Sequence, residues 1–550
     1  HAQRNAAPTR FGVTEMMENR TGWPLLIAGV VLLAALQLWL RPLLPVDETR
    51  YLSVAWEMWS RGEFLVPWLN GEVYSQKPPL LFWMIQGLWT VFGVAELPAH
   101  LIMVVLSLLA LWWSALLAGR LWPEHAAVVR PLAPWLLFGS VFWMNFYTLV
   151  QFDLLLALAA LGAWLGVLRA RQRPLSGWSM VGVAIGLGVL SKGPVILLPV
   201  LPVMLLAPWW LRGAQPLSWW RWYLGAFSAV LLGATIALAW AIPAGLAGGE
   251  AYRQAIFWGQ SAGRMVQSFA HRSPWWSYLL WLPLLGLPWL LWPPLLRGVR
   301  RLSLQDRGVR FCLAVLVPAL LLFSLISGKQ AKYLLPLLPL LAILAARALA
   351  DAETSRTRFR LWPAGGLLAV VGVALTALPW WPHGPDWLAR VQPMWGVALL
   401  LWSLPFFLLR LRLASAVRAM VAAVWLATAT LYLGVVDLMA PQYQLGPLAG
   451  RLAGLQRSGH DLAWLGRYHG QFQFLGRLRE PIEPLTGRRQ LRAWLTAHPQ
   501  GYLLVNYPGV HPDVPDSLPV QPYRSGSLVL WPAPELLRAP AQLDAIAGNA

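Results

Sequence analysis

Long apolar runs separated by short polar loops recur along most of this 550-residue chain. A helix needs about 20 apolar residues to cross the hydrocarbon core of a bilayer, and many of these runs come close to that length. Only 12% of the residues are charged, well below the roughly 25% typical of soluble domains. A transmembrane barrel would instead show segments of about ten residues that alternate in polarity. The chain is therefore predicted to be a polytopic α-helical membrane protein.

The runs predict about thirteen membrane-spanning helices. They lie near residues 23–40, 97–118, 131–148, 153–168, 178–191, 194–211, 222–247, 276–296, 311–327, 333–350, 361–378, 395–409 and 419–439. Arginines gather in every second loop, and membrane proteins keep Lys and Arg in cytoplasmic loops. This alternation assigns residues 1–22 to the cytoplasm and loops 41–96 and 248–275 to the periplasm. The net charge of +20 then reflects orientation, and no nucleic-acid partner is expected.

Residues 440–550 differ in character from the rest of the chain. They contain strand-like runs, GYLLVNY (501–507) and SLVLW (527–531), between Gly and Pro residues. An amphipathic stretch, RRQLRAWLTAH (488–498), precedes the first of these runs. This pattern predicts a small soluble α/β domain, and the loop alternation assigns it to the periplasmic side. Residues 23–439 would then form the transmembrane domain.

The first predicted outer loop is unusually rich in charge. Between residues 46 and 83 it holds Asp47, Glu48, Arg50, Glu57, Arg61, Glu63, Glu72 and Lys77. An apolar stripe at helical spacing follows Asp47, formed by Leu52, Ala55, Trp56 and Trp59. This spacing predicts a helix that lies in the membrane interface and does not cross it. Asp47, Arg50 and Tyr51 share another face of that helix. A solvated linker in which Asp47 caps the helix and pairs with Arg50 is the alternative.

Other polar residues are predicted on the same outer side. Asp153 opens a span, Lys192 ends one, and Lys329, Lys332 and Tyr333 precede another. Together they suit an anionic, membrane-resident ligand such as a phosphate or pyrophosphate on a lipid, because Arg forks bind phosphate and Lys supplies a point charge. A carboxylate among them could act as a general base or electrostatically. Taken one at a time, each cation could instead snorkel at a helix end.

Several motifs resemble those of the C-type (GT-C) glycosyltransferases. The first outer loop carries DETRY at 47–51 and GEVYSQKPPLLFW at 71–83, with the acidic pair, Arg-Tyr and Lys-Pro-Pro in order. KGP at 192–194, the pattern KxxKYLLPLLP at 329–339 and the acid that opens the fourth span are similar to further family motifs. The chain most resembles bacterial lipid A aminoarabinose transferases, which are related to protein O-mannosyltransferases. The resemblance covers essentially the whole chain and implies a GT-C fold with its catalytic domain over 23–439.

The resemblance also implies an activity. Enzymes of this family transfer 4-amino-4-deoxy-L-arabinose from undecaprenyl phosphate to lipid A phosphates on the periplasmic face of the Gram-negative inner membrane, which gives resistance to polymyxin and cationic peptides. Asp47 is then the main catalytic carboxylate and Asp153 a second essential acid. The residues implied around the donor phosphate are Arg50, Lys77, Arg264 and Tyr333, with Tyr51, Tyr74 and Lys192 nearby. Gln76 stands where the family often has an acid before Lys-Pro-Pro, so no role for that acid is carried over.

Three roles stay open for Asp47. It could remove a residual proton from the acceptor, orient the ammonium group of the sugar, or stabilise positive charge on the sugar ring. One in-line displacement would invert the anomeric centre. No compact metal-binding signature such as HExxH is present, so no cofactor is expected; a zinc ion on His271, Glu480 and Glu483 is the alternative. The enzyme is expected to be monomeric.

Other functions remain compatible with the pattern. The same fold could transfer another sugar to a protein, a glycan or another lipid. A flippase or transporter for a lipid-linked sugar is an alternative of another class, and charges buried deep within the spans would favour it. The middles of the predicted spans are nearly free of Asp, Glu, Lys and Arg. A receptor with an outer binding domain is a third alternative, and it would not need the acids of the first loop.

Overall fold

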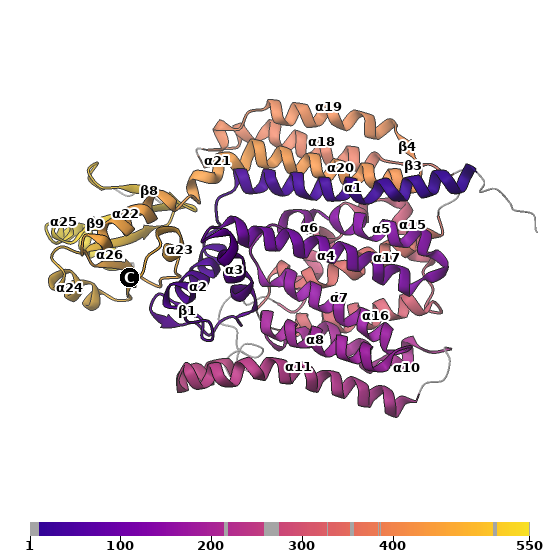
Figure 1. Cartoon of the computed structure of the whole chain (residues 1–550). Helices are drawn as coiled ribbons and strands as arrows, with labels where there is room; N and C mark the ends of the chain where they lie inside the picture. The colour runs from indigo at the N-terminus through magenta and orange to yellow at the C-terminus, as the bar shows by residue number, and fades with distance from the viewer. Residues whose placement is uncertain are drawn as a thin grey trace, which may run out of the picture.

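The computed structural model describes residues 10–213, 218–257, 274–326, 328–352, 357–382, 384–385, 387–509 and 514–548. A bundle of long helices makes up most of it, and a smaller sheet domain lies at one end of the bundle (Figure 1). In the described ranges, nine helices are long and apolar enough to cross a membrane: Gly22–Leu40, Leu97–Leu121, Phe152–Ala170, Pro174–Lys192, Trp219–Ala247, Arg307–Leu325, Ala331–Ala350, Trp362–Trp380 and Leu413–Arg457. The chain is a multi-span membrane protein.

The helices of the bundle are numbered in chain order. They are α1 (Arg10–Leu40), α2 (Asp47–Arg61), α3 (Leu80–Phe92), α4 (Leu97–Leu121), α5 (Ala126–Phe138), α6 (Val141–Phe146), α7 (Phe152–Ala170), α8 (Pro174–Lys192), α9 (Leu197–Leu205), α10 (Ala207–Trp210), α11 (Trp219–Ala247), α12 (Glu250–Gln254), α14 (Ser277–Leu285), α15 (Pro293–Arg301), α16 (Arg307–Leu325), η5 (Ala331–Leu337), α17 (Leu338–Ala350), α18 (Trp362–Ala377), α19 (Met394–Leu408), α20 (Leu413–Leu431) and α21 (Asp437–Met439). A short ladder joins β3 (Phe359–Arg360) to β4 (Arg410–Leu411).

Two of the predicted spans are interrupted in the structure. The run 131–148 is divided between α5 and α6 at Gly139, where an added Cβ would lie 2.6 Å from side-chain atoms of Trp289 and Val421. The run 276–296 is divided between α14 and α15; Pro288 lies in the break, and Pro293 begins α15. Proline lacks the N–H that a continuing helix needs. The count of thirteen stays a prediction, since three further apolar helices, Leu80–Phe92, Pro194–Leu205 and Met394–Leu408, are shorter.

The segment after α1 folds as two helices joined by a small hairpin. Asp47 and Glu48 lie in the first turn of α2, where carboxylates interact favourably with the helix dipole. Gly62 ends α2 in the left-handed conformation with φ 67°. The hairpin pairs β1 (Trp68–Leu69) with β2 (Glu72–Val73). Asn70 and Gly71 connect them with φ of 56° and 81°, as a two-residue hairpin turn requires.

Helix α2 is enclosed by protein on more faces than its single apolar stripe predicts. Apart from Arg50, its residues from Glu48 to Met58 are buried, on both the apolar stripe and the opposite faces. It packs against α3 on one side and α23 (Gln473–Gly476) of the sheet domain on another. The indole N–H of Trp56 donates to the Leu478 carbonyl at 2.9 Å. The C-terminal segment supplies a second buried surface that the periodicity of the helix alone does not reveal, and the solvated-linker alternative is excluded.

The sheet domain is built in three layers. Its strands are β5 (Leu462–Leu465), β6 (Glu483–Leu485), β7 (Tyr502–Tyr507), β8 (Val520–Tyr523) and β9 (Gly526–Pro532), in the order β6-β5-β7-β9-β8. β5 runs parallel to β6 and β7, whereas β9 is antiparallel to β7 and β8. Alternate strand residues enter two cores, one under α22 (Gly446–Arg457) and the other under α24 (Arg488–Ala497), α25 (Ala533–Leu537) and α26 (Pro540–Gly548). In Figure 1 the segment from α2 to α3 lies between this domain and the helical bundle.

Candidate active site

Asp47 lies at the start of α2 and pairs with two cations. Its Oδ1 accepts a hydrogen bond from Arg50, one turn further along the helix, at 2.7 Å. Its Oδ2 accepts one from the ammonium group of Lys332 in η5, 285 residues further along the chain, at 2.6 Å. The carboxylate side chain is 36% exposed. It is therefore accessible to a ligand while it is held between two positive groups.

The charge balance keeps Asp47 ionised. Burial alone would raise the pKa of its carboxyl group, but Lys332, Arg50 and Lys77 together lower that pKa below its ordinary value of 3.8. Asp47 is consequently a carboxylate at neutral pH and a weak base. An efficient general base has a pKa near the working pH, so this environment favours an electrostatic or orienting role.

A second ion pair is more deeply buried. Asp153 lies in the first turn of α7, and Lys192 is the last residue of α8 before Gly193, which has φ 82°. Lys192 donates directly to Asp153, and the two side chains are only 12% and 4% exposed. The Lys192 ammonium also lies 4.1 Å from the ring centre of Tyr333, a cation–π distance. Since Tyr333 follows Lys332 in sequence, η5 contributes to both ion pairs.

Aromatic side chains connect the two pairs. The ring of Tyr51 meets Phe152, the neighbour of Asp153, edge to face at 4.9 Å between centroids. Lys77 lies 5.8 Å from the centre of the same Phe152 ring. Burial and then the Asp47 charge raise the pKa of Tyr51 well above its ordinary value. Its phenol therefore stays protonated and can donate a hydrogen bond between the two carboxylates.

An apolar groove runs between α8 and α11 and reaches Lys192. Its cavity volume is about 310 Å³, and it includes Lys192, Gly193 and Pro78 at one end. Apart from Ser75, the rest of the lining is apolar, with Ile185, Val189, Leu197, Val230, Ala234, Ala237, Leu238 and Trp240 among its residues. A groove with hydrocarbon walls and a cation at its end suits a lipid that carries an anionic head group.

Most of the predicted site residues converge here. Those gathered around the two ion pairs are Asp47, Arg50, Tyr51, Lys77, Asp153, Lys192 and Tyr333. Tyr74 is buried close by, with its ring 6.3 Å from that of Phe82. Arg264 and His271 lie outside the described residues. Glu480 and Glu483 lie on the sheet domain, where Glu483 accepts a hydrogen bond from Trp494 at 2.9 Å. In the described ranges no three His, Cys, Asp or Glu side chains form a group that could hold a metal.

Comparison with known proteins gives the relatives of this chain. Residues 76–243 match the family described as dolichyl-phosphate-mannose-protein mannosyltransferase. An undecaprenyl phosphate-alpha-4-amino-4-deoxy-L-arabinose arabinosyl transferase of Pseudomonas paraeruginosa is 31% identical over 374 residues, 66% of this chain and 65% of the relative. The protein of the same name from Pseudomonas aeruginosa is 32% identical over 372 residues, with the same coverage. Each alignment thus spans just under two thirds of the length of the relative.

Solved structures extend the likeness to nearly the whole chain. The crystal structure of ArnT from Cupriavidus metallidurans bound to undecaprenyl phosphate superposes with a TM-score of 0.70 over 93% of this chain and 98% of that one, at 20% identity. This chain has the GT-C glycosyltransferase fold. The archaeal oligosaccharyltransferase AglB from Archaeoglobus fulgidus shares the GT-C arrangement at greater distance, with a TM-score of 0.51, 13% identity, and coverage of 88% and 69%. The resemblance inferred from the first-loop motifs is confirmed.

Two residues of this site make contacts that were not predicted from the sequence. Lys332 holds Asp47, yet only its neighbour Tyr333 was assigned; the motif KxxKYLLPLLP contained the signal, because both lysines were predicted to face outward. Glu48 is buried beside Asp47 and binds Arg41 at 2.6 Å and the backbone N–H groups of Leu44 and Val150 at 3.0 and 2.9 Å. Arg41 and Leu44 are close to Glu48 in sequence, whereas Val150 lies 102 residues away, so the local pattern does not show that Glu48 joins α2 to the start of α7.

Proposed function

We propose that this chain is an inverting glycosyltransferase that moves 4-amino-4-deoxy-L-arabinose from undecaprenyl phosphate to phosphate groups of lipid A. The observation that carries the proposal is Asp47 held between Arg50 and Lys332, beside a second ion pair at the end of an apolar groove. The names of the Pseudomonas relatives specify this donor and sugar. The GT-C neighbour from Cupriavidus metallidurans was crystallised with undecaprenyl phosphate. The product would confer resistance to polymyxin.

The donor would bind with its tail in the apolar groove and its phosphate near the cations. Burial of the first isoprene units against α8 and α11 supplies affinity in proportion to the apolar area removed from water. The phosphate would compete with Asp47 for Arg50 and Lys332, because both anions attract the same guanidinium and ammonium groups. Donor binding would therefore loosen the ion pairs of Asp47 and turn the carboxylate toward the sugar.

Transfer would proceed by a single displacement. An oxygen of the acceptor phosphate forms a bond to the anomeric carbon while the bond from that carbon to the donor phosphate oxygen breaks. The electron pair leaves with undecaprenyl phosphate, and the configuration at the anomeric carbon inverts. Arg50, Lys332 and Lys77 would stabilise the charge that develops on the leaving phosphate. The acceptor is already an anion, so little proton abstraction is needed.

Asp47 would act through its charge. Its lowered pKa makes it a poor proton acceptor at neutral pH. A fixed carboxylate beside the reacting sugar stabilises positive charge on the ring and attracts the ammonium group of the aminosugar. Of the three roles open from sequence, the two electrostatic ones are therefore favoured over general base catalysis.

The reaction is proposed to need no metal ion. Arg50 and Lys332 both lie within hydrogen-bonding distance of Asp47, and Lys192 pairs with Asp153. These cations supply the positive charge that a divalent ion would otherwise bring to a phosphate, and they would repel such an ion. The enzyme is further proposed to be a monomer in the bacterial inner membrane with this site on the periplasmic side.

The test is mass spectrometry of lipid A. In cells that lack other aminoarabinose transferases, expression of the wild-type chain should add aminoarabinose to lipid A phosphates. Asp47→Asn should lower the modification about 10²- to 10⁴-fold, because the amide keeps the size of the carboxylate but loses its charge. Glu250→Gln serves as a control at an exposed ion pair. The proposal would be refuted if cells that express the wild-type chain showed no added aminoarabinose on lipid A. Full modification in cells that express Asp47→Asn would refute it as well.

A further inference from the structure

A basic hollow lies at the opposite ends of the spans from Asp47. It has a volume of about 420 Å³ and is formed where α4 and α7 end and α8 and α16 begin. Five arginines line this arginine hollow: Arg120, Arg169, Arg171, Arg173 and Arg307. No Asp or Glu is among the lining residues. The arginines come from three different loops that the charge pattern assigns to the cytoplasmic side, and the proposed transfer reaction uses none of them.

The arginines of this hollow are half-buried or exposed, and no carboxylate of the described residues neutralises them. Within the described part of the chain, none of the five forms an ion pair, and Arg169 donates only to the Ser176 hydroxyl at 2.9 Å. The Nε of Arg171 is buried without a hydrogen-bond partner. Burial, followed by the charge of Arg307, lowers the pKa of Arg171. Arg171 and Arg307 both line the hollow, and no carboxylate lies among its lining residues.

Nearby arginines on the same face show the contrast. Arg347 pairs with Asp306 at 3.2 Å and with Asp351 at 2.9 Å. Arg310 donates to the carbonyl of Arg212 at 2.7 Å. Each of these two side chains has a partner within the protein, although Nε of Arg310 and Nη1 of Arg347 are buried without a hydrogen bond. Arg347 differs from the arginines of the hollow in that carboxylates neutralise its charge. Five positive charges gathered around one hollow without a carboxylate repel one another, so a ligand that supplies an anion would stabilise this corner of the bundle.

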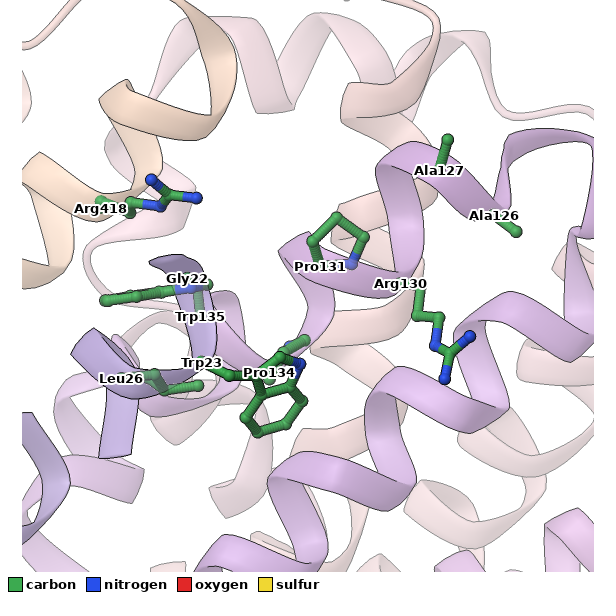
Figure 2. A pocket seen from close by; sticks show the side chains of 10 residues that line it. All are labelled: Gly22, Trp23, Leu26, Ala126, Ala127, Arg130, Pro131, Pro134, Trp135 and Arg418. Atoms are coloured by element: carbon green, nitrogen blue, oxygen red, sulfur yellow. The ribbon is translucent and has the colours of Figure 1, made fainter. Parts of the chain in front are cut away.

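A second hollow on this face is less basic. Figure 2 shows Arg418 and Arg130 on separate helices around a lining of Trp23, Trp135 and prolines. The Arg418 guanidinium lies 5.9 Å from the ring centre of Trp135, so it already has a cation–π partner within the protein. The arginine hollow is therefore the stronger candidate for an anion site.

We propose that the arginine hollow binds the phosphate head group of an anionic phospholipid from the inner leaflet. Its arginines lie at the ends of helices long and apolar enough to cross a membrane, where lipid phosphates would meet them. Guanidinium groups from several helices can hold a phosphodiester in bidentate contacts, while the acyl chains lie against the apolar helices. Basic pockets between spans on the cytoplasmic side are suited to such lipids. The site would be separate from the transfer reaction.

Native mass spectrometry of the purified full-length protein tests this site. Titration with phosphatidylglycerol should load the wild type at much lower concentration than titration with phosphatidylethanolamine, whose head group has no net charge. Arg171→Gln/Arg307→Gln should weaken phosphatidylglycerol binding about tenfold to a hundredfold, as the loss of charge-assisted hydrogen bonds predicts. Arg300→Gln/Arg301→Gln is the matched control, because it removes two exposed arginines of α15 outside the hollow. The control should bind like the wild type.

Three results would overturn the proposal. Equal weakening in both double variants would show that the face attracts the lipid without a defined site. Equal binding of the two lipids by the wild type would exclude recognition of the anion, and this comparison needs no variant to fold. Inorganic phosphate that displaces phosphatidylglycerol at equal concentration would identify a soluble anion as the ligand, since free phosphate gains nothing from acyl chains.

Discussion

Asp47 illustrates how two residues far apart in sequence define one reactive group. Arg50 lies on the same helix, so the spacing i, i+3 brings it to the carboxylate whatever the tertiary structure. Lys332 arrives from η5 and is the largest influence that lowers the pKa of Asp47. The properties of the carboxylate therefore depend on a contact that the helix itself does not provide.

Removal of Lys332 should shift the pH dependence of transfer. In the wild type the pKa of Asp47 is lowered, so the charged form persists on acidification and is lost only as the pH falls through that lowered value. In Lys332→Ala, burial remains and raises the pKa, so the acid limb of the rate profile should move to higher pH. The measurement is transfer by purified protein as a function of pH. Lys329→Ala, in which the lost ammonium group had donated to the Ile326 carbonyl at 2.7 Å, is the control. An unmoved acid limb in Lys332→Ala would contradict the assignment.

Arg50 should contribute to affinity for the donor phosphate. Arg50→Ala and Lys77→Ala should each weaken binding of undecaprenyl phosphate about tenfold to a hundredfold, since a charge-assisted contact is worth about 1.5–3 kcal/mol. Arg50→Lys should recover only part of the loss, because a point charge cannot replace a bidentate fork. Titration of the lipid into purified variants measures this. Wild-type affinity in both alanine variants would mean that Arg50 serves only to pair with Asp47.

At the scale of elements, α2 is the part that aligns the site. Glu48 fastens its first turn to the end of α1 through Arg41 and to the start of α7 through the Val150 N–H. The same turn carries Asp47, and α7 carries Asp153 in its own first turn. One buried carboxylate therefore fixes the distance between the two acids of the site.

Glu48→Ala should destabilise the protein substantially. The Glu48 and Arg41 side chains are 1% and 4% exposed, and loss of one partner of a buried ion pair costs about 3–5 kcal/mol. Thermal unfolding of the purified protein in detergent should show a lower midpoint, and transfer should fall with it. Glu250→Ala removes an exposed partner, 60% accessible, and should leave the midpoint nearly unchanged. Equal midpoints for the two variants would show that Glu48 does not anchor α2.

At the scale of the molecule, the two ends of the bundle have different chemistry. The sheet domain lies at one end of the bundle (Figure 1). The two ion-paired acids, Asp47 and Asp153, lie at the same end, as does the part of the apolar groove that contains Lys192. The arginine hollow lies at the other end. This separation agrees with the alternation of arginine-rich loops and suits chemistry at one membrane surface better than a charged path through the membrane, which a transporter would require.

Labelling from one side of the membrane tests this orientation. Gln172→Cys is exposed beside the arginine hollow, and Ser458→Cys is exposed on the sheet domain. A membrane-impermeant thiol reagent applied from the periplasm should label Ser458→Cys and not Gln172→Cys. The native Cys312 is fully buried and should stay unmodified. Labelling of both introduced cysteines from the periplasm would show that the predicted topology is wrong.

The sequence by itself determined the class of fold and the membership of most of the site. Apolar length and arginine alternation report on bilayer thickness and membrane sidedness, which act locally on each segment. The motifs DETRY, KGP and KxxKYLLPLLP indicated Asp47, Arg50, Lys192 and Tyr333 as site residues. Each motif is contiguous in sequence, so it could be identified without the tertiary structure.

Only the tertiary structure decided which of these residues touch. Asp47 could have paired with Arg50 alone, and no local pattern indicated that Lys332 would donate to its second carboxylate oxygen. The apolar stripe of α2 predicted one buried face, whereas the sheet domain also buries others. The arginine hollow likewise exists only because four helix ends meet. Periodicity states which side of a helix avoids water, but the surface that covers it comes from remote parts of the chain and is fixed by packing.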